Sequence, residues 1–255
     1  MAEQYTAWKA LITSGAAVSG WQKFYVYFYQ AFIEGDRWKQ YLNGVVSTLY
    51  VTALALILGV ILGILVAIVR TAHDQQRPGH RNPLLSVLNA IFKVYITVIR
   101  GTPMMVQLLI MGFVIFSSSK NFALVGALTL GINSGAYQAE IIRGGLMAVD
   151  AGQMEAGRSL GMTYGDTMRF VVIPQAVKAI LPALGNEFII LLKDTSLISV
   201  IGGKELLYAA RAIVSRTYEA MYPFLGTAVI YLALVMVFTW LLGIFERRLR
   251  QSDRR

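Results

Sequence analysis

The feature that most constrains this chain is a set of long apolar windows without charged residues. The stretch from Gln40 to Val69 contains no Asp, Glu, Lys or Arg, and Arg70 follows it directly. An α-helix needs about 20 apolar residues to cross the ~30 Å hydrocarbon core of a bilayer. Only 15 % of the residues are charged and 56 % are hydrophobic, whereas soluble domains carry about 25 % charged residues. The sequence therefore predicts a membrane protein.

Windows of this kind predict five crossings. The fourth is apolar except for Glu187, Lys193 and Asp194. The predicted crossings are residues 40–69, 101–119, 121–139, 179–202 and 220–245. The expected fold is all-α: a polytopic membrane helical bundle with about five transmembrane helices, in a transmembrane domain covering residues 42–250.

The apolar segment 83–100 is interrupted by Lys93. We expect it to lie as a helix at the cytoplasmic interface and to lead into the second crossing. At the junction, Thr102 is a candidate helix cap, and Pro103 suits the first position of the following helix.

Both ends of the chain differ from the crossings. Residues 1–41 are rich in aromatic side chains but broken by charges, so we expect an interfacial extension. Five crossings place the termini on opposite sides of the lipid bilayer. The basic tail 251–255 then lies in the cytoplasm and the N-terminus outside, since Lys and Arg favour cytoplasmic segments. This topology explains the net charge of +9 without nucleic acid as a partner.

A long cytoplasmic loop at residues 150–174 carries two helix-start signals. Asp150 with Gln153, and Thr163 with Asp166, have the spacing of capping residues, and Gly161 suits a helix end. The first of these two short helices carries small residues, which let another backbone approach closely. The pattern fits either a helix that docks into a cleft of a partner or an ordinary structured surface loop.

The same loop carries a family resemblance. Its residues Glu155-Ala156-Gly157, Gly161 and Val171-Val172-Ile173-Pro174 are similar to the coupling-loop signature of ABC importer permeases, which reads Glu-Ala-Ala, three residues, Gly, nine residues, then Ile-x-Leu-Pro. Three further stretches, YITVIRGTPMMVQLL, NSGAYQAEIIRGGLMAV and LPALGNEFIILLKDTSLISVIG, resemble the polar amino acid uptake branch of this family, and the resemblance covers about residues 42–250. The resemblance implies that Glu155, Ala156, Gly157, Gly161 and Pro174 couple the chain to an ATPase.

The resemblance further implies a multi-pass subunit of the bacterial cytoplasmic membrane and a set of partners. These are ATP-binding cassette ATPase subunits, an extracytoplasmic amino-acid-binding protein, and a second permease subunit, either an identical or a related chain. The chain has no Gly-x-x-x-x-Gly-Lys-Ser/Thr phosphate loop. We therefore expect no cofactor on this chain, and ATP on the partner subunits.

Ionisable residues inside the predicted crossings are costly and call for partners. One interpretation is mutual pairing, with Lys193 satisfying a carboxylate. The other is a polar pathway for a zwitterion. The family resemblance implies that substrate contacts are made by Asn133, Tyr137, Glu140, Lys193, Asp194 and Thr195. Glu187 is assigned to helix packing, against Asn186 or Lys193, and Gln107 to an interhelical hydrogen bond.

The sequence predicts neither a catalytic nor a metal site. His73 and His80 are separated by Pro78-Gly79, so they do not share a helical face. The alternative function is a proton-coupled secondary carrier that uses Glu140 and Asp194 as relays. It would predict uptake without an ATPase partner.

Overall fold

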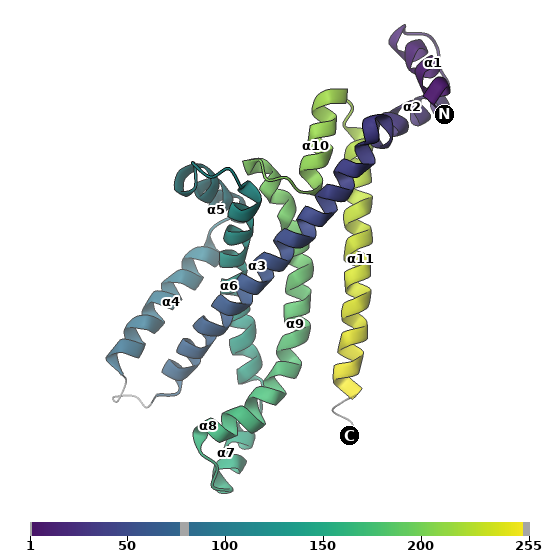
Figure 1. The fold of residues 1–255 in the computed structure, drawn as a ribbon. Helices are drawn as coiled ribbons and strands as arrows, with labels where there is room; N and C mark the ends of the chain where they lie inside the picture. Colours follow the sequence, from purple (N-terminus) through teal and green to yellow (C-terminus); the bar gives the residue numbers. More distant parts are fainter. Residues whose placement is uncertain (1, 77–81, 252–255) are drawn as a thin grey trace.

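The computed structural model describes residues 2–76 and 82–251, and within them it contains helices and no strands. Figure 1 shows a bundle with the N-terminus at one end and the end of the last helix at the other, on the same side as α7 and α8. The elements in order are α1 Ala2–Thr13, α2 Gly20–Phe32, η1 Glu34–Asp36, α3 Arg37–Asp74, α4 Pro83–Gly101, α5 Met104–Ile110, η2 Met111–Ile115, α6 Phe122–Met147, α7 Ala151–Ser159, α8 Tyr164–Thr167, η3 Met168–Val172, α9 Ile173–Asp194, η4 Thr195–Ile201, α10 Leu206–Thr217 and α11 Met221–Gln251.

The central feature of the bundle is the packing of α3 along α6. With 38 residues, α3 is about 57 Å long. Its glycines allow close approach: a Cβ at Gly59 would lie 2.7 Å from Nε2 of Gln138, and one at Gly63 would lie 2.8 Å from the Gln138 Cβ. Small residues at such positions let membrane helices gain van der Waals contact.

The predicted first, fourth and fifth crossings are confirmed as long apolar helices. By length and composition, the segments able to cross a membrane are Glu34–Asp74, Pro83–Gly101, Tyr164–Ile201 and Met221–Leu249. The first, third and fourth of these match the predicted crossings, and at most one residue at an end of a crossing is left uncovered.

The assignment of the second crossing was wrong. The helix long and apolar enough to span is α4, and the predicted crossing 101–119 is broken. The break lies at Thr102, whose backbone is extended, because Pro103 disfavours a helical residue before it. The following apolar helical segment, Met104–Ile115, is only about 18 Å long. The Thr102 hydroxyl donates to the Val98 carbonyl (2.9 Å) and does not cap α5.

The third predicted crossing corresponds to α6. This helix is long, but it is less apolar than the four segments named above. Its 26 residues correspond to about 39 Å. Polar side chains such as Ser134 and Gln138 lower its hydropathy, and both are buried. Because α6 packs against α3, α4 and α9, these side chains find partners in protein instead of lipid.

The N-terminal segment forms a hairpin of α1 and α2 at the end of the bundle where the chain begins (Figure 1). Glu34 of η1, which follows α2, holds α1 in place, because it accepts hydrogen bonds from the Tyr5 hydroxyl (2.7 Å) and the Lys9 ammonium (3.0 Å). The predicted domain boundary at residues 41 and 42 falls inside α3, which begins at Arg37. Residues 252–255 of the predicted basic tail, and His80 of the loop, lie outside the described residues.

Candidate functional site

The loop at residues 150–174 folds into the two capped helices that the sequence predicted. The Asp150 side chain accepts a hydrogen bond from the Gly152 amide (2.6 Å) at the start of α7. The Thr163 hydroxyl accepts from the Asp166 amide (3.2 Å) at the start of α8. Between them, Gly161 has φ +81°, a left-handed conformation that favours glycine at a helix end. Gln153 does not complete a capping box, since its side chain accepts from Gln175 (3.2 Å).

The proposed coupling residues divide between a buried and an exposed face of α7. Gly157 is buried, and a Cβ there would lie 2.6 Å from Cγ2 of the buried Thr167. Glycine at this position therefore allows α7 to pack closely on α8. Glu155 and Ala156 are exposed, as are Gly161 and Pro174. The exposed face of α7 is thus open to contact with another protein.

The loop is joined without a helical break to a membrane-spanning helix. From α8 the chain passes through η3, a short π-helical segment, into α9, so that residues Tyr164–Ile201 form one helical segment. A side contact reaches α3, because the Tyr164 hydroxyl donates to the Gln75 side chain. A displacement of the loop would therefore act on both α9 and α3.

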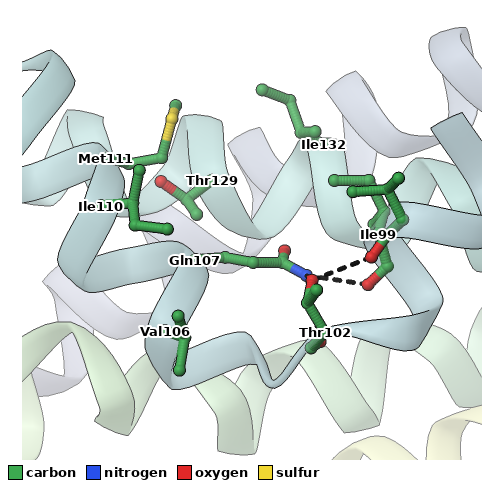
Figure 2. Close-up of a pocket in the computed structure, with 9 residues that line it drawn as sticks. Ile99, Thr102, Val106, Gln107, Ile110, Met111, Thr129 and Ile132 are labelled. Carbon is green, nitrogen blue, oxygen red and sulfur yellow. Dashed lines mark hydrogen bonds between the residues drawn. The ribbon is translucent and has the colours of Figure 1, made fainter.

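Asn133 and Gln107 link α6 to the break between α4 and α5. The Asn133 amide donates to Oε1 of Gln107 (3.0 Å), which confirms Gln107 as an interhelical hydrogen-bonding residue. Gln107 Nε2 also donates to the Ile99 carbonyl (2.8 Å), near which it lies in Figure 2, and to the Thr102 hydroxyl (2.8 Å). Gln107 thereby satisfies a carbonyl left unpaired by the end of α4. It lines a mostly apolar cavity of about 240 Å³.

Tyr137, one turn after Asn133 on α6, faces a cation that the sequence analysis did not select. The Arg100 guanidinium lies 5.0 Å from the centre of the Tyr137 ring, within the range of a cation–π interaction. Arg100 stands in the last turn of α4, directly before the Gly101-Thr102-Pro103 break. In the sequence, Arg100 could have been identified by its position beside a helix-breaking motif in an apolar region.

Glu140 belongs to an ion-pair cluster between α3 and α6. Its carboxylate pairs with Arg70 of α3, and more loosely with Arg143 on its own helix (3.5 Å). Arg143 also lies 3.7 Å from Asp74. The pairing expected for an intramembrane carboxylate is therefore present, but its partner is Arg70 and not Lys193. The sequence could not show this, because Arg70 appeared only as the end of a crossing.

The other three proposed substrate residues lie together at the end of α9. Lys193 is exposed and lines a cavity of about 370 Å³ with residues of α10 and α11. Asp194 is half-buried. Thr195 is buried, and its hydroxyl donates to the Leu192 carbonyl (2.8 Å). Among the contacts of the described residues, none joins this group directly to Asn133, Tyr137 or Glu140.

The polar link between α6 and α9 is made by Glu187. Its carboxylate accepts from the Ser134 hydroxyl (2.7 Å), which in turn accepts from Nε2 of Gln138 (2.8 Å). Glu187 therefore serves helix packing as expected, but its hydrogen-bonding partner is Ser134 of α6 and not Asn186 or Lys193. The polar faces of α6 and α9 do meet, although through different residues from those expected.

A further carboxylate, Glu205, was not singled out from the sequence. Its side chain is 2 % exposed. It caps α10 by accepting from the Leu207 (2.7 Å) and Tyr208 (2.6 Å) amides, and it accepts from the Tyr231 hydroxyl of α11 (2.8 Å). Burial raises the pKa of the Glu205 carboxyl from 4.5 to about 7. In the sequence, the one feature that could have identified Glu205 was the position of an acidic residue directly before a helical segment.

Comparisons with known proteins identify the family. The model for binding-protein-dependent transport system inner membrane components matches residues 82–251. The glutamine transport system permease protein GlnP of Escherichia coli (strain K12) is 34 % identical over 213 residues, covering 82 % of this chain and 92 % of the relative. The arginine transport system permease protein ArtQ of Bacillus subtilis (strain 168) is 35 % identical over 217 residues, covering 83 % and 93 %.

Solved structures of transporters are similar to this chain as well. A crystal structure of an amino acid ABC transporter with histidines contains a chain that is 43 % identical, with a TM-score of 0.73 over 82 % of this chain and 94 % of that one. The inward-facing MetNI methionine ABC transporter is 20 % identical with a TM-score of 0.70, covering 86 % and 99 %, and supports the fold alone.

The chain belongs to the family of binding-protein-dependent transport system inner membrane components. The predicted membership of the ABC importer permeases is confirmed, and with it the function of a permease subunit. Such a subunit is a transport component and not an enzyme. The alternative of a self-sufficient secondary carrier is not favoured, because all these relatives are subunits of multi-component systems.

Proposed function

We propose that this chain is the permease subunit of an ATP-driven importer that moves a polar amino acid across the bacterial cytoplasmic membrane. Relatives named for glutamine and arginine transport support this substrate class. The partners are two ATPase subunits that bind and hydrolyse ATP, an extracytoplasmic amino-acid-binding protein, and a second permease chain, identical or related. The chain itself holds no cofactor in this proposal.

The observation that carries the proposal is the exposed face of α7, on a loop that continues as one helical segment into α9. Glu155 provides the charged contact with the ATPase, and Ala156 permits close approach. Gly161 ends α7, and Pro174 stands at the start of α9. Movement of the ATPase subunits would displace α7 and α8, and the attached helix would transmit that displacement into the membrane.

The proposed orientation places the end of the bundle that bears α7 and α8 in the cytoplasm. The end of α11 lies on that same side, and the N-terminus on the other (Figure 1). The arginines around the end of α11, Arg247 and Arg248 among them, favour the cytoplasmic side. In this orientation the hairpin of α1 and α2 meets the outer interface.

The amino acid would pass along the polar residues of α6 and α9. We assign substrate contacts to Asn133, Tyr137, Glu140, Lys193, Asp194 and Thr195. Carboxylates suit the substrate ammonium group, whereas Lys193 and the Asn133 amide suit its carboxylate. The Glu187–Ser134 hydrogen bond supports this assignment, since it holds the two helices side by side. Glu140 would exchange Arg70 for the substrate during transport.

The test uses vesicles that contain the permease, its ATPase and its binding protein, with ATP on the ATPase side. Glu155→Lys should leave the permease inserted but lower ATP-dependent uptake of labelled glutamine or arginine by about tenfold or more, because it reverses a charge at a protein contact. Glu246→Lys, at the end of α11, is the matched charge reversal outside the loop and should have little effect. Equal uptake by wild type and Glu155→Lys would contradict the proposed coupling.

A further inference from the structure

A third cavity lies between the end of α3 and the start of α9, and none of the proposed substrate residues lines it. It has a volume of about 680 Å³ and is lined by residues of α3, α6, α8, η3 and α9. Apart from Thr71, Gln75 and Tyr164, every lining residue is apolar. A polar amino acid would find almost no hydrogen-bonding partner there, so its chemistry differs from that of the proposed pathway.

The depth of the cavity matches one leaflet of a membrane. Its lining on α3 runs from Val60 to Gln75, which is about 22 Å of helix at ~1.5 Å per residue. Half of a bilayer, including its interfacial region, measures about 20–22 Å. On α9 the lining runs from Ile173 to Leu184, again at the end nearest the loop. The length of the cavity along α3 is therefore comparable with the thickness of one leaflet, and the cavity lies toward the end of the bundle that bears α7 and α8.

The cavity opens onto the exposed apolar surface of α3. Ile64 is 45 % exposed and Ile68 is 60 % exposed, and both line the cavity. Ile57 and Ile61 continue the same exposed apolar surface along α3. A hydrocarbon chain in the surrounding bilayer can therefore enter from the side. An apolar space of this size does not hold ordered water, because water needs two to four polar partners.

Among the described residues that line the cavity, one buried side-chain oxygen is unpaired. The Thr71 hydroxyl oxygen is buried and has no hydrogen-bond partner among the described residues. Gln75 and Tyr164 close the polar end of the cavity through their side-chain hydrogen bond. The arrangement is amphipathic: a long aliphatic space, one unpaired hydroxyl, and then polar side chains at the rim. A buried hydroxyl without a partner is costly, which points to an acceptor supplied by a ligand.

We propose that this cavity binds a glycerophospholipid of the cytoplasmic leaflet. One acyl chain lies between α3 and α9, its ester carbonyl accepts a hydrogen bond from the Thr71 hydroxyl, and the headgroup lies beside Gln75 and Tyr164. The assignment to the cytoplasmic leaflet rests on the orientation proposed above. The bound lipid fills the space between α3 and the start of α9, so it supports the side of the coupling loop that faces the membrane.

The test uses the full chain in nanodiscs of phosphatidylethanolamine and phosphatidylglycerol. A small share of the phosphatidylethanolamine carries a diazirine near the middle of one acyl chain. After irradiation, mass spectrometry should locate adducts on the cavity-lining parts of α3, α6 and α9. Ala72→Phe, which places a ring in the cavity, should lower these adducts by at least about tenfold. Thr71→Val should lower them by about fivefold, the worth of one hydrogen bond.

Leu65→Phe is the matched control, because Leu65 is an exposed residue of the same helix that does not line the cavity. It should leave the cavity adducts unchanged. Equal labelling in wild type and Ala72→Phe would overturn the proposal, since it would mean general contact with bulk lipid. Covalent dimers of an Ile68→Cys variant, in a chain with no other cysteine, would overturn it in favour of a second copy of the chain.

Labelling requires neither ATP nor partners. Cavity adducts that depend on Ala72 and Thr71 therefore support lipid binding even if uptake fails. Loss of uptake in Glu155→Lys with normal labelling would concern the coupling loop alone.

Discussion

The two ends of α3 show how differently one helix can be packed. At the end near the N-terminus, a Cβ at Gly44 would lie 2.8 Å from the Cα of Leu206, so the backbones of α3 and α10 are in direct contact. The Leu206 amide also donates to the Thr48 hydroxyl (3.3 Å). At the other end, a cavity of about 680 Å³ lies between α3 and α9, and the Tyr164–Gln75 hydrogen bond joins the end of α3 to the loop at residues 150–174.

This difference indicates where the subunit can change shape. Backbone contact and buried hydrogen bonds hold α10 to α3 and α11, and such an arrangement has little freedom to move. An apolar cavity closed by one exposed hydrogen bond allows larger displacement at low cost. We therefore expect the loop at residues 150–174 to move against the end of α3 near Gln75, with the end near Gly44 as the fixed point.

The largest effect is expected where the backbones touch. Gly44→Leu should prevent correct packing of α10, at a cost of about 3 kcal/mol or more, because the neighbouring atoms belong to the backbone and cannot rotate away. The recovery of monodisperse protein and its melting temperature measure this. Gly144→Leu on α6 is the control, since nothing lies within 4 Å of a Cβ at that position. Equal melting temperatures for the two variants would show that the end of α3 near Gly44 is not tightly packed.

A smaller effect is expected from the titration of Glu205 at the same end. Its pKa is raised from 4.5 to about 7 by burial, although hydrogen bonds and Arg211 oppose the shift. The folded state therefore binds this proton more tightly than the unfolded state. The resulting stability is fully present below pH ~4.5 and is lost as the pH rises to ~7, with a total of roughly 3 kcal/mol.

Melting temperatures measured between pH 4.5 and 8 test this expectation. The decrease with rising pH should be reduced in Glu205→Gln, which removes the titrating group. Glu155→Gln replaces an exposed carboxylate of the coupling loop and should keep the wild-type profile. If the Glu205→Gln and wild-type profiles had the same slope, another group would be responsible for the pH dependence.

The smallest effect on stability is expected at the end of α3 near Gln75. Tyr164→Phe removes one exposed hydrogen bond to Gln75, worth at most about 1 kcal/mol. The melting temperature should hardly change, whereas ATP-dependent uptake should fall by about two- to fivefold because the loop loses its contact with α3. Tyr218→Phe, at a side chain that is 93 % exposed beyond α10, provides the control. Unchanged uptake in Tyr164→Phe would show that a displacement of the loop reaches the membrane-spanning helices through α9 and not through α3.

Much of the local structure followed from the sequence because it depends on neighbouring residues. Asp150 and Thr163 cap the helices of the loop through bonds to amides two or three residues away, and the spacing alone predicts such bonds. The apolar windows likewise predicted α3 and α11, since length and hydropathy decide whether a helix can cross a bilayer. The loop motif also identified the family.

The assignment of the second crossing failed for a local reason. Charged residues delimit the apolar windows of the sequence. On that basis Lys93 predicts an interruption of the apolar segment 83–100, and Thr102-Pro103 predicts the start of the next helix. In the structure a single lysine does not end α4, whereas proline does, because it disfavours helical geometry in the residue before it. Within an apolar region, the backbone restriction decided the boundary and the isolated charge did not.

The sequence by itself determined the class of protein, the helical fold and the caps of the coupling loop, because each of these depends on contiguous residues. Only the tertiary structure decided that Glu140 pairs with Arg70, that Glu187 meets Ser134, that Glu205 joins α10 to α11, and that an apolar cavity lies beneath the loop. These features join residues that are 26 to 70 positions apart. Which residues of two helices face each other depends on how those helices pack, and local spacing does not contain that information.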